Sequence, residues 1–122
     1  MTQSSRDLAD ILDELREFVR ERDWEQFHDP KNLVMALASE VGELVAEYRW
    51  VTSSESDALT SRSDAIDRVG QEIADVAIAL LLLCDRVGID LIPAIHRKLG
   101  VNAVNYPVQG ARGRATRPAG GT

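Results

Sequence analysis

Residues 64–87 decide the fold, and they read DAIDRVGQEIADVAIALLLLCDRV. The charged first half of this stretch gives way to an apolar run from Val76 to Cys84. Because a membrane-spanning helix needs about 20 apolar residues, the run predicts a buried helix that ends at Gly88, a favourable C-terminal residue. The helix is apolar on nearly every side after Asp75, and one small bundle cannot cover all of it. We therefore expect a second copy of the chain to complete the core.

Three further segments have the apolar spacing of amphipathic helices. The first runs from about Arg6 to Glu21. The next begins at Asp29-Pro30, an N-cap followed by proline at the first helical position, and runs to about Trp50. The last runs from the cap residue Asp90 to about Asn105. With 64–87, these segments predict an all-α fold, a four-helix bundle completed by oligomerisation.

The 122 residues suit one domain. We assign residues 1–106 to the helical domain and residues 107–122 to a flexible basic C-terminal tail, which has little apolar pattern. Residues 52–63 are polar and rich in Ser, Thr and Asp, so we expect a mobile loop there.

The net charge of −6 is unevenly distributed. All 20 acidic residues fall within residues 1–90, whereas residues 91–122 carry only basic charges. An acidic body argues against nucleic-acid binding and suits a protein that collects divalent cations. The single cysteine, Cys84, cannot form an internal disulfide, and the acidic N-terminal stretch is unlike a signal peptide. We expect a cytoplasmic protein with no nucleic-acid or membrane partner.

Two pairs of acidic residues border the apolar stripes of consecutive helices. Glu40 and Glu43 lie beside the stripe of the second helix, and Glu72 and Asp75 are i, i+3 neighbours on the third. If these helices pack antiparallel, four carboxylates face one another and repel unless a cation joins them. Oxygen ligands favour Mg²⁺ or Mn²⁺, and the lack of His or Cys at this spacing argues against zinc. A solvated charged face is the alternative for each pair.

The spacing of these pairs resembles the signature of the MazG-like, all-α nucleoside triphosphate pyrophosphohydrolases. Between Glu40-x-x-Glu43 and Glu72-x-x-Asp75 there are 28 residues. Over about residues 8–108 the sequence resembles the dCTP pyrophosphatase branch of that family. The matching pieces are DWEQFHDPKNL at 23–33, SEVGEL at 39–44, Trp50, Lys98, Asn102 and Tyr106-Pro107. The chain departs from the family pattern at Ser39, where many members have Glu, at Leu15, where some have His, and at Asn105, where relatives often have Arg.

The resemblance implies that four acids hold Mg²⁺, with Mn²⁺ as a substitute: Glu40, Glu43, Glu72 and Asp75. Family members cleave between the α- and β-phosphates and release a nucleoside monophosphate and pyrophosphate. A metal held by carboxylates neutralises phosphate oxygens and orients the phosphate chain. One of these acids, or a further carboxylate, takes a proton from the attacking water, and the sequence does not identify which.

The same resemblance gives the substrate contacts, which are Trp24, His28, Trp50, Asp75, Lys98, Asn102 and Tyr106. Lys98 and Asn102, one helical turn apart, would hold the outgoing phosphates, although Lys98 can also be read as a surface lysine. Trp24 and Trp50 either pack in a core or stack on a base, and their family positions favour stacking. His28 is either a loop hydrogen-bonding residue or a contact to the base.

We therefore expect an enzyme that cleaves dCTP or a modified dCTP and so cleans the nucleotide pool. The alternatives are the same chemistry on dUTP or another noncanonical triphosphate, and a non-catalytic helical module. The two tryptophans flank a helix of about 20 residues, which places them roughly 30 Å apart. Either the flanking loops fold back along the helix, or two subunits of a homo-dimer or homo-tetramer share the pocket, which we favour.

Overall fold

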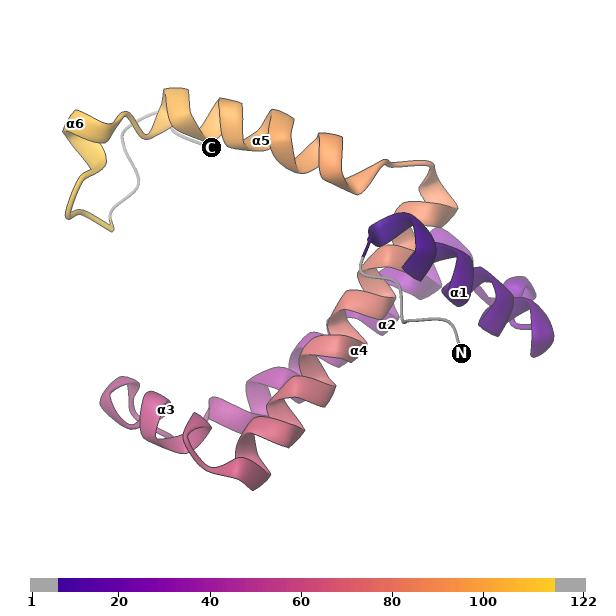
Figure 1. Cartoon of the computed structure of the whole chain (residues 1–122), viewed down its shortest axis with the longest axis horizontal. Helices are drawn as coiled ribbons and strands as arrows, with labels where there is room; N and C mark the ends of the chain where they lie inside the picture. The colour runs from indigo at the N-terminus through magenta and orange to yellow at the C-terminus, as the bar shows by residue number, and fades with distance from the viewer. Residues whose placement is uncertain (1–6, 116–122) are drawn as a thin grey trace. The chain divides into compact units, whose positions relative to one another are not determined.

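The computed structural model describes residues 7–115, and this part of the chain is helical without a strand (Figure 1). Its elements are α1 (Leu8–Glu21), the 3-10 turn η1 (Glu25–Phe27), α2 (Pro30–Tyr48), α3 (Ser53–Thr60), α4 (Ser63–Val87), α5 (Leu91–Asn105) and α6 (Val108–Ala111). The all-α prediction is confirmed, and α1, α2, α4 and α5 are the four expected helices. None of the described helices combines the length and apolar character that a membrane crossing requires.

Local sequence signals fix the helix ends. The carboxylate of Asp29 accepts a hydrogen bond from the backbone N–H of Asn32 at 2.8 Å, and Pro30 opens α2. At the other end of the central pair, α4 stops at Gly88, whose φ of 75° is the left-handed conformation that glycine adopts without strain. The start of α2 and the end of α4 therefore fall where the sequence predicts.

The expected mobile loop over residues 52–63 is wrong, because most of it forms α3. Thr52 and Glu55 make a capping box. The Glu55 N–H donates to the Thr52 hydroxyl at 3.3 Å, and the Thr52 N–H donates to the Glu55 carboxylate at 2.9 Å. Two backbone donors that would otherwise be unsatisfied are thus paired, and this stabilises a short helix of polar composition.

The pair α2 and α4 forms the centre of the first of two compact units, the part of the described chain up to Gly88. The helices run antiparallel. Glu47, near the end of α2, bonds Arg68, near the start of α4, whereas Leu33 and Leu82 line one cavity at the opposite end. In Figure 1 the two ribbons lie side by side along this length. The two acidic pairs were expected to meet only if these helices pack antiparallel, and that condition is confirmed.

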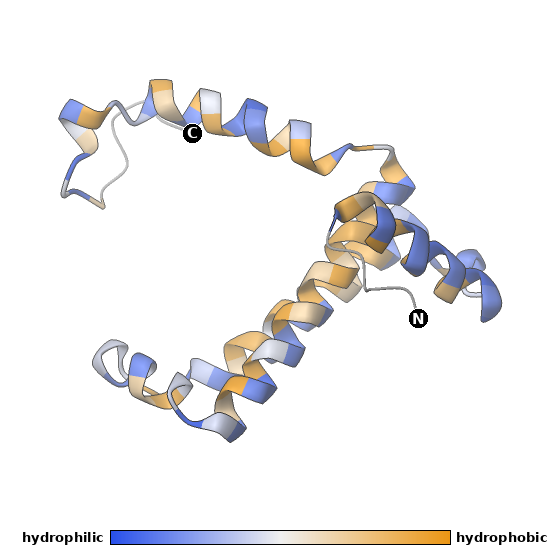
Figure 2. Ribbon diagram, in the orientation of Figure 1, coloured by the Kyte–Doolittle hydropathy of each residue, from blue (hydrophilic) through white to orange (hydrophobic). Residues whose placement is uncertain are grey.

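Within residues 7–115 the core is small, and its buried apolar residues are Val19, Leu33, Ala65, Val69, Ala79, Leu81 and Cys84. Cys84 is therefore buried, as the apolar run predicts. Apolar side chains also remain exposed on α4, including Ile73 and Ile78. Figure 2 shows hydrophobic positions along much of the α4 ribbon. The second unit, from Ile89 onward, carries α5 and α6 and exposes Leu99 and Val104. These exposed residues motivate the expectation of an oligomer, which stays a prediction.

The proposed tail begins with α6, a single helical turn, and residues 116–122 lie outside the described part of the chain. The flexibility predicted for residues 107–122 therefore stays a prediction.

Candidate metal centre and adjoining cavities

Three carboxylates meet at the seam between α2 and α4. Glu40 comes from the middle of α2, and Glu72 and Asp75 come from successive turns of α4. One oxygen of each lies within 4.8 Å of the other two. Glu40 and Glu72 are half-buried and Asp75 is exposed. The antiparallel packing thus gathers three of the four acids that the sequence predicts as ligands.

The negative charges of this cluster have no counter-charge within residues 7–115. None of the ion pairs in that range includes Glu40, Glu72 or Asp75. Partial burial raises the pKa of Glu72 above its ordinary value, and the charges of Asp75, Glu43, Glu40 and Glu47 raise it further. A site that holds its own carboxylates in unfavourable proximity is suited to binding a cation.

The fourth predicted ligand, Glu43, lies one turn beyond Glu40 on α2 and is exposed. Its oxygens are not among those that come within 4.8 Å of one another. Its charge nevertheless contributes to the raised pKa of Glu72. A further turn along α2, Glu47 accepts a hydrogen bond from Arg68 at 3.1 Å. Glu47 is therefore neutralised within the chain, whereas a ligand role for Glu43 stays a prediction.

An apolar cavity of about 200 Å³ lies further along α4, and its lining begins one helical turn beyond Asp75. Its walls are Leu15, Phe18, Val19, Trp24, His28, Ile78 and Leu82. Ile78 lies one helical turn beyond Asp75 on α4, which places the cavity next to the acids. Trp24 packs edge-on against Phe18, with ring centroids 5.8 Å apart, and keeps 44% of its surface exposed. The structure therefore places Trp24 and His28, both predicted substrate contacts, in one cavity.

A larger cavity of about 390 Å³ shares three of these walls, Val19, His28 and Leu82. Its other walls are mostly charged: Arg16, Arg20, Glu25, Leu33, Asp85 and Arg86. Arg16 on α1 donates two hydrogen bonds to Asp85 on α4, at 2.6 and 3.1 Å, and the pairing raises the pKa of Arg16. This ion pair ties α1 to α4 beside the cavity.

Trp50 does not join Trp24 within one chain. It follows the C-terminal end of α2, is 84% exposed, and has the Arg49 guanidinium 5.4 Å from its ring centroid. Trp24 precedes the other end of α2, whose 19 residues span about 28 Å. The cavity that contains Trp24 is not lined by Trp50. The loops therefore do not fold back to bring both rings to one base.

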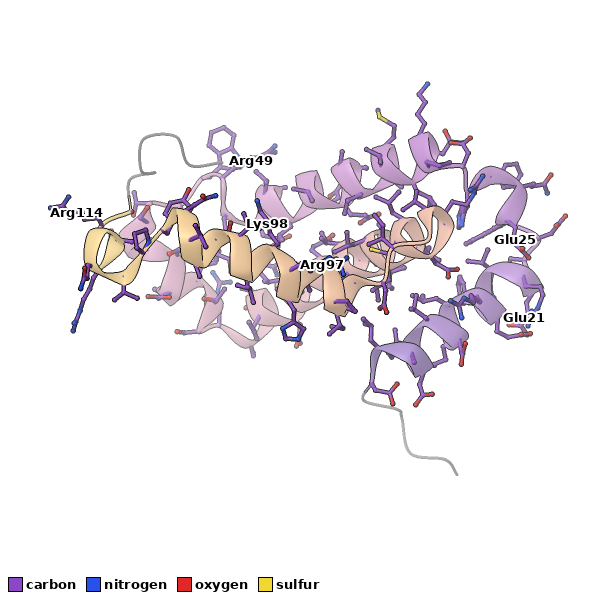
Figure 3. All side chains as sticks on the ribbon, turned by 90° about the horizontal axis from the view of Figure 1, so that it is seen from above. Glu21, Glu25, Arg49, Arg97, Lys98 and Arg114 are labelled. Atoms are coloured by element: carbon purple, nitrogen blue, oxygen red, sulfur yellow. The ribbon has the colours of Figure 1, made fainter. Side chains whose placement is uncertain are left out.

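The remaining predicted contacts lie on the second unit. Lys98 projects from α5 next to Arg97 (Figure 3) and is exposed. Asn102 and Tyr106 are half-buried and follow Lys98 at intervals of four residues, so the three share one side of the helix. The Tyr106 N–H donates to the Asn102 carbonyl at 2.8 Å and closes α5. Their contact with phosphates stays a prediction.

Comparison with known proteins agrees with this arrangement. The model of the MazG-like family matches residues 9–117. The chain belongs to the MazG-like family. The MazG-like chain is 39% identical over 110 residues to dCTP pyrophosphatase 1 of Rattus norvegicus, an alignment that covers 90% of the chain. It is 40% identical over 105 residues to dCTP pyrophosphatase 1 of Homo sapiens, covering 86% of the chain. The family resemblance is thus confirmed.

The MazG-like chain spans 65% of the rat protein and 62% of the human protein. A crystal structure of a pyrophosphatase from Archaeoglobus fulgidus has 38% sequence identity to the chain and a TM-score of 0.78. That similarity covers 88% of the MazG-like chain and 98% of the archaeal one. The chain therefore shares its helical fold with a solved pyrophosphatase over most of its length.

Sequence reasoning missed two interhelical ion pairs of this MazG-like chain, Arg16 with Asp85 and Arg68 with Glu47. No local sequence pattern predicts either ion pair, because each pair joins two different helices. It named Leu15 as a departure from the family pattern, and the structure places this side chain in the wall of the apolar cavity together with Ile78. The spacing of Asp75 and Ile78, one turn apart, was the available signal for that neighbourhood.

Proposed function

We propose that the chain is a Mg²⁺-dependent nucleoside triphosphate pyrophosphohydrolase that cleaves the α–β phosphoanhydride of dCTP or a modified dCTP. The products are a nucleoside monophosphate and pyrophosphate, and the role is cleaning of the cytoplasmic nucleotide pool. The observation that carries the proposal is the cluster of Glu40, Glu72 and Asp75 beside an apolar cavity with an aromatic wall. Relatives named dCTP pyrophosphatase 1 support the choice of substrate.

The chemistry of the donor set fits Mg²⁺ or Mn²⁺. All three gathered side chains offer carboxylate oxygens, which are the ligands of these hard cations. Glu40, Glu72 and Asp75 would hold the ion, with Glu43 as the fourth acid. When bound, such a cation neutralises the charge of the phosphate oxygens. One of the four carboxylates, or another acid nearby, accepts the proton of the attacking water.

The rest of the site serves to hold the nucleotide. Trp24 offers an aromatic face in the apolar cavity, and stacking of a base on such a face is worth about 1–3 kcal/mol. Lys98 supplies a positive charge for the outgoing phosphates, with Asn102 and Tyr106 beside it. Asp75 serves both the cation and the substrate. Trp50, which is exposed in the single chain, completes the pocket of a partner copy.

A homo-dimer or homo-tetramer is part of the proposal. Ile73 and Ile78 on α4 and Leu99 and Val104 on α5 expose apolar surface that a second copy would cover. Sedimentation at low micromolar concentration should therefore show an oligomer. A stable, folded monomer would contradict this part of the proposal.

The experiment that tests the function is pyrophosphate release from a panel of triphosphates, with Mg²⁺ and without it. The panel contains dCTP, 5-methyl-dCTP, dUTP, dTTP and the purine triphosphates. Asp75→Asn should abolish release, whereas Asp57→Asn, an exposed acid on α3, should leave it unchanged. A chain that releases no pyrophosphate from any triphosphate would exclude the proposal and favour a non-catalytic helical module.

A further inference from the structure

The ion pair of Arg16 with Asp85 joins α1 to α4 at the border of the two cavities. We propose that Arg16 and Asp85 are positioning residues, which keep α1 in place as one wall of the apolar cavity. They thereby set the affinity of the site for the nucleoside part of its substrate, although neither side chain touches the base. The inference rests on the proposed function, which places the base in that cavity.

The apolar cavity depends on where α1 lies. Three of its seven walls belong to α1, namely Leu15, Phe18 and Val19. Ile78 and Leu82 belong to α4, and the other two walls come from the segment between α1 and α2. The cavity therefore exists only while α1 lies against α4, and a displacement of α1 would open it to water.

Apolar packing alone attaches α1 weakly. Val19 is the single buried residue among those of α1, all of which belong to the described part of the chain. Leu15 is half-buried, and Phe18 remains 45% exposed. Because apolar stabilisation scales with the area removed from water, little of it holds this helix. One polar bond between the helices therefore has a large relative effect on the position of α1.

The guanidinium of Arg16 supplies this bond with two donors. Its Nε and Nη2 both donate to Oδ1 of Asp85, at 3.1 and 2.6 Å. A planar guanidinium held at two points has a fixed orientation, which a lysine ammonium would not have. Its Nη1 donates to Asp13, one turn earlier on α1, at 3.1 Å. The side chain is thus braced on its own helix while it holds the other one.

The ion pair lies next to two walls of the apolar cavity. Arg16 precedes Val19 by one turn on α1, and Asp85 follows Leu82 by one turn on α4. Val19 and Leu82 line both cavities, whereas Arg16 and Asp85 line only the larger one. The pair therefore acts on the apolar cavity through the position of α1, and not through a contact with the base.

The acids that would hold the cation lie away from this bond. Asp85 follows Asp75 on α4 by ten residues, or about 15 Å along the axis. Loss of the ion pair should therefore raise KM and leave kcat within about twofold. An ion pair that is partly exposed is worth up to about fivefold in an equilibrium constant. We accordingly expect KM to rise by about threefold to fivefold.

The test measures kcat and KM for dCTP in Arg16→Gln, in Asp85→Asn and in the double variant. Each single variant should raise KM, and the double variant should raise it no further, because all three lack the same bond. Arg16→Lys keeps the charge and should recover part of the loss. The matched control is Arg20→Gln. Arg20 lines the same larger cavity one turn further along α1, but pairs with Glu17 of its own helix, so KM should not change.

Quenching of Trp24 fluorescence by acrylamide reports the position of α1 without turnover. Trp24 packs edge-on against Phe18 of α1 and is 44% exposed. In a Trp50→Phe background, Trp24 is the only tryptophan of the chain. Arg16→Gln and Asp85→Asn should each raise its quenching constant, by at most about twofold, because 44% of its surface is already accessible. Arg20→Gln should leave the constant unchanged.

Product inhibition separates the positioning of α1 from general damage to the fold. The inhibition constant of dCMP should rise together with KM, whereas that of pyrophosphate, which has no base, should not change. The inference would be overturned by additive effects in the double variant, by an equal effect of Arg20→Gln, by a parallel rise for pyrophosphate or by unchanged quenching of Trp24. A wild type that cleaves no triphosphate would instead exclude the proposed function, and the quenching series would still show whether the ion pair positions α1.

Discussion

Trp24 and Trp50 allow a direct test of whether the nucleotide pocket is built within one chain or between two. The rings flank opposite ends of α2, about 28 Å apart along the helix axis. Trp24 lines the apolar cavity, and Trp50 is 84% exposed and absent from its walls. If both rings hold one base, Trp50 must come from a partner copy. We therefore consider Trp24→Ala and Trp50→Ala expressed together.

The activity expected of the mixed dimers follows from their twofold symmetry. In a twofold dimer each shared pocket takes Trp24 from one copy and Trp50 from the other, so a heterodimer has one pocket with both rings and one with neither. Random pairing of equal amounts makes about half of the dimers heterodimers, which restores about one quarter of the wild-type activity. Each variant alone loses one stacking contact of about 1–3 kcal/mol, or about 5- to 150-fold in kcat/KM.

The assay is pyrophosphate release by heterodimers isolated through two different affinity tags. The control is a heterodimer of the wild type with the double variant Trp24→Ala/Trp50→Ala. A shared pocket leaves each site of this control with only one ring and therefore impaired, whereas a pocket within one chain leaves one site intact and about half the activity. If isolated heterodimers of a Trp24→Ala chain with a Trp50→Ala chain are no more active than either variant alone, the shared pocket is wrong.

Three further predictions concern the acids and α3. Glu43→Gln and Asp75→Asn should each abolish Mg²⁺-dependent turnover. The melting temperature of the metal-free protein should hold or rise, because repulsion between the carboxylates falls. Near-wild-type turnover in either variant would remove that residue from the ligand set. Burial and neighbouring carboxylates raise the pKa of Glu72, so the metal-free fold should gain thermal stability as pH falls through that pKa. Glu72→Gln should reduce this gain. Glu14→Gln, a substitution of an exposed acid, should leave it unchanged. Thr52→Ala should lower the free energy of unfolding in urea by about 1 kcal/mol through loss of the α3 cap, and an unchanged midpoint would argue against that role.

The sequence predicted the long helices because their determinants are local. Asp29 and Pro30 specify the start of α2 within four residues, and Gly88 specifies the end of α4. The same local logic was available for α3, since Thr52 and Glu55 form the spacing of a capping box. The polar composition of residues 52–63 led to the wrong prediction of a loop. Two capping hydrogen bonds stabilise a helix there in spite of that composition.

The site was predicted only in part, because helix periodicity places some of its residues and tertiary packing places the others. Glu40 must meet Glu72 and Asp75 once two adjacent helices run antiparallel, so helix periodicity sufficed. Side-chain direction decides whether Glu43 joins them, and periodicity does not determine it. The ion pair of Arg16 with Asp85 joins residues 69 positions apart and depends on how α1 packs against α4. Tertiary packing of this kind is not encoded in any short pattern.

The pair α2 and α4 carries two features that are unfavourable in an isolated chain, a cluster of like charges and exposed apolar surface. Glu40, Glu72 and Asp75 repel one another without a cation, and Ile73 and Ile78 expose apolar surface on the helix that carries two of those acids. A chain selected for stability alone would replace such acids, because relieving repulsion and burying apolar surface both stabilise a fold. Their presence at one place is explained if a cation and a nucleotide bind there while a second copy covers the apolar side. The repelling acids and the exposed apolar surface, which both destabilise an isolated chain, are therefore the features that the proposed function requires.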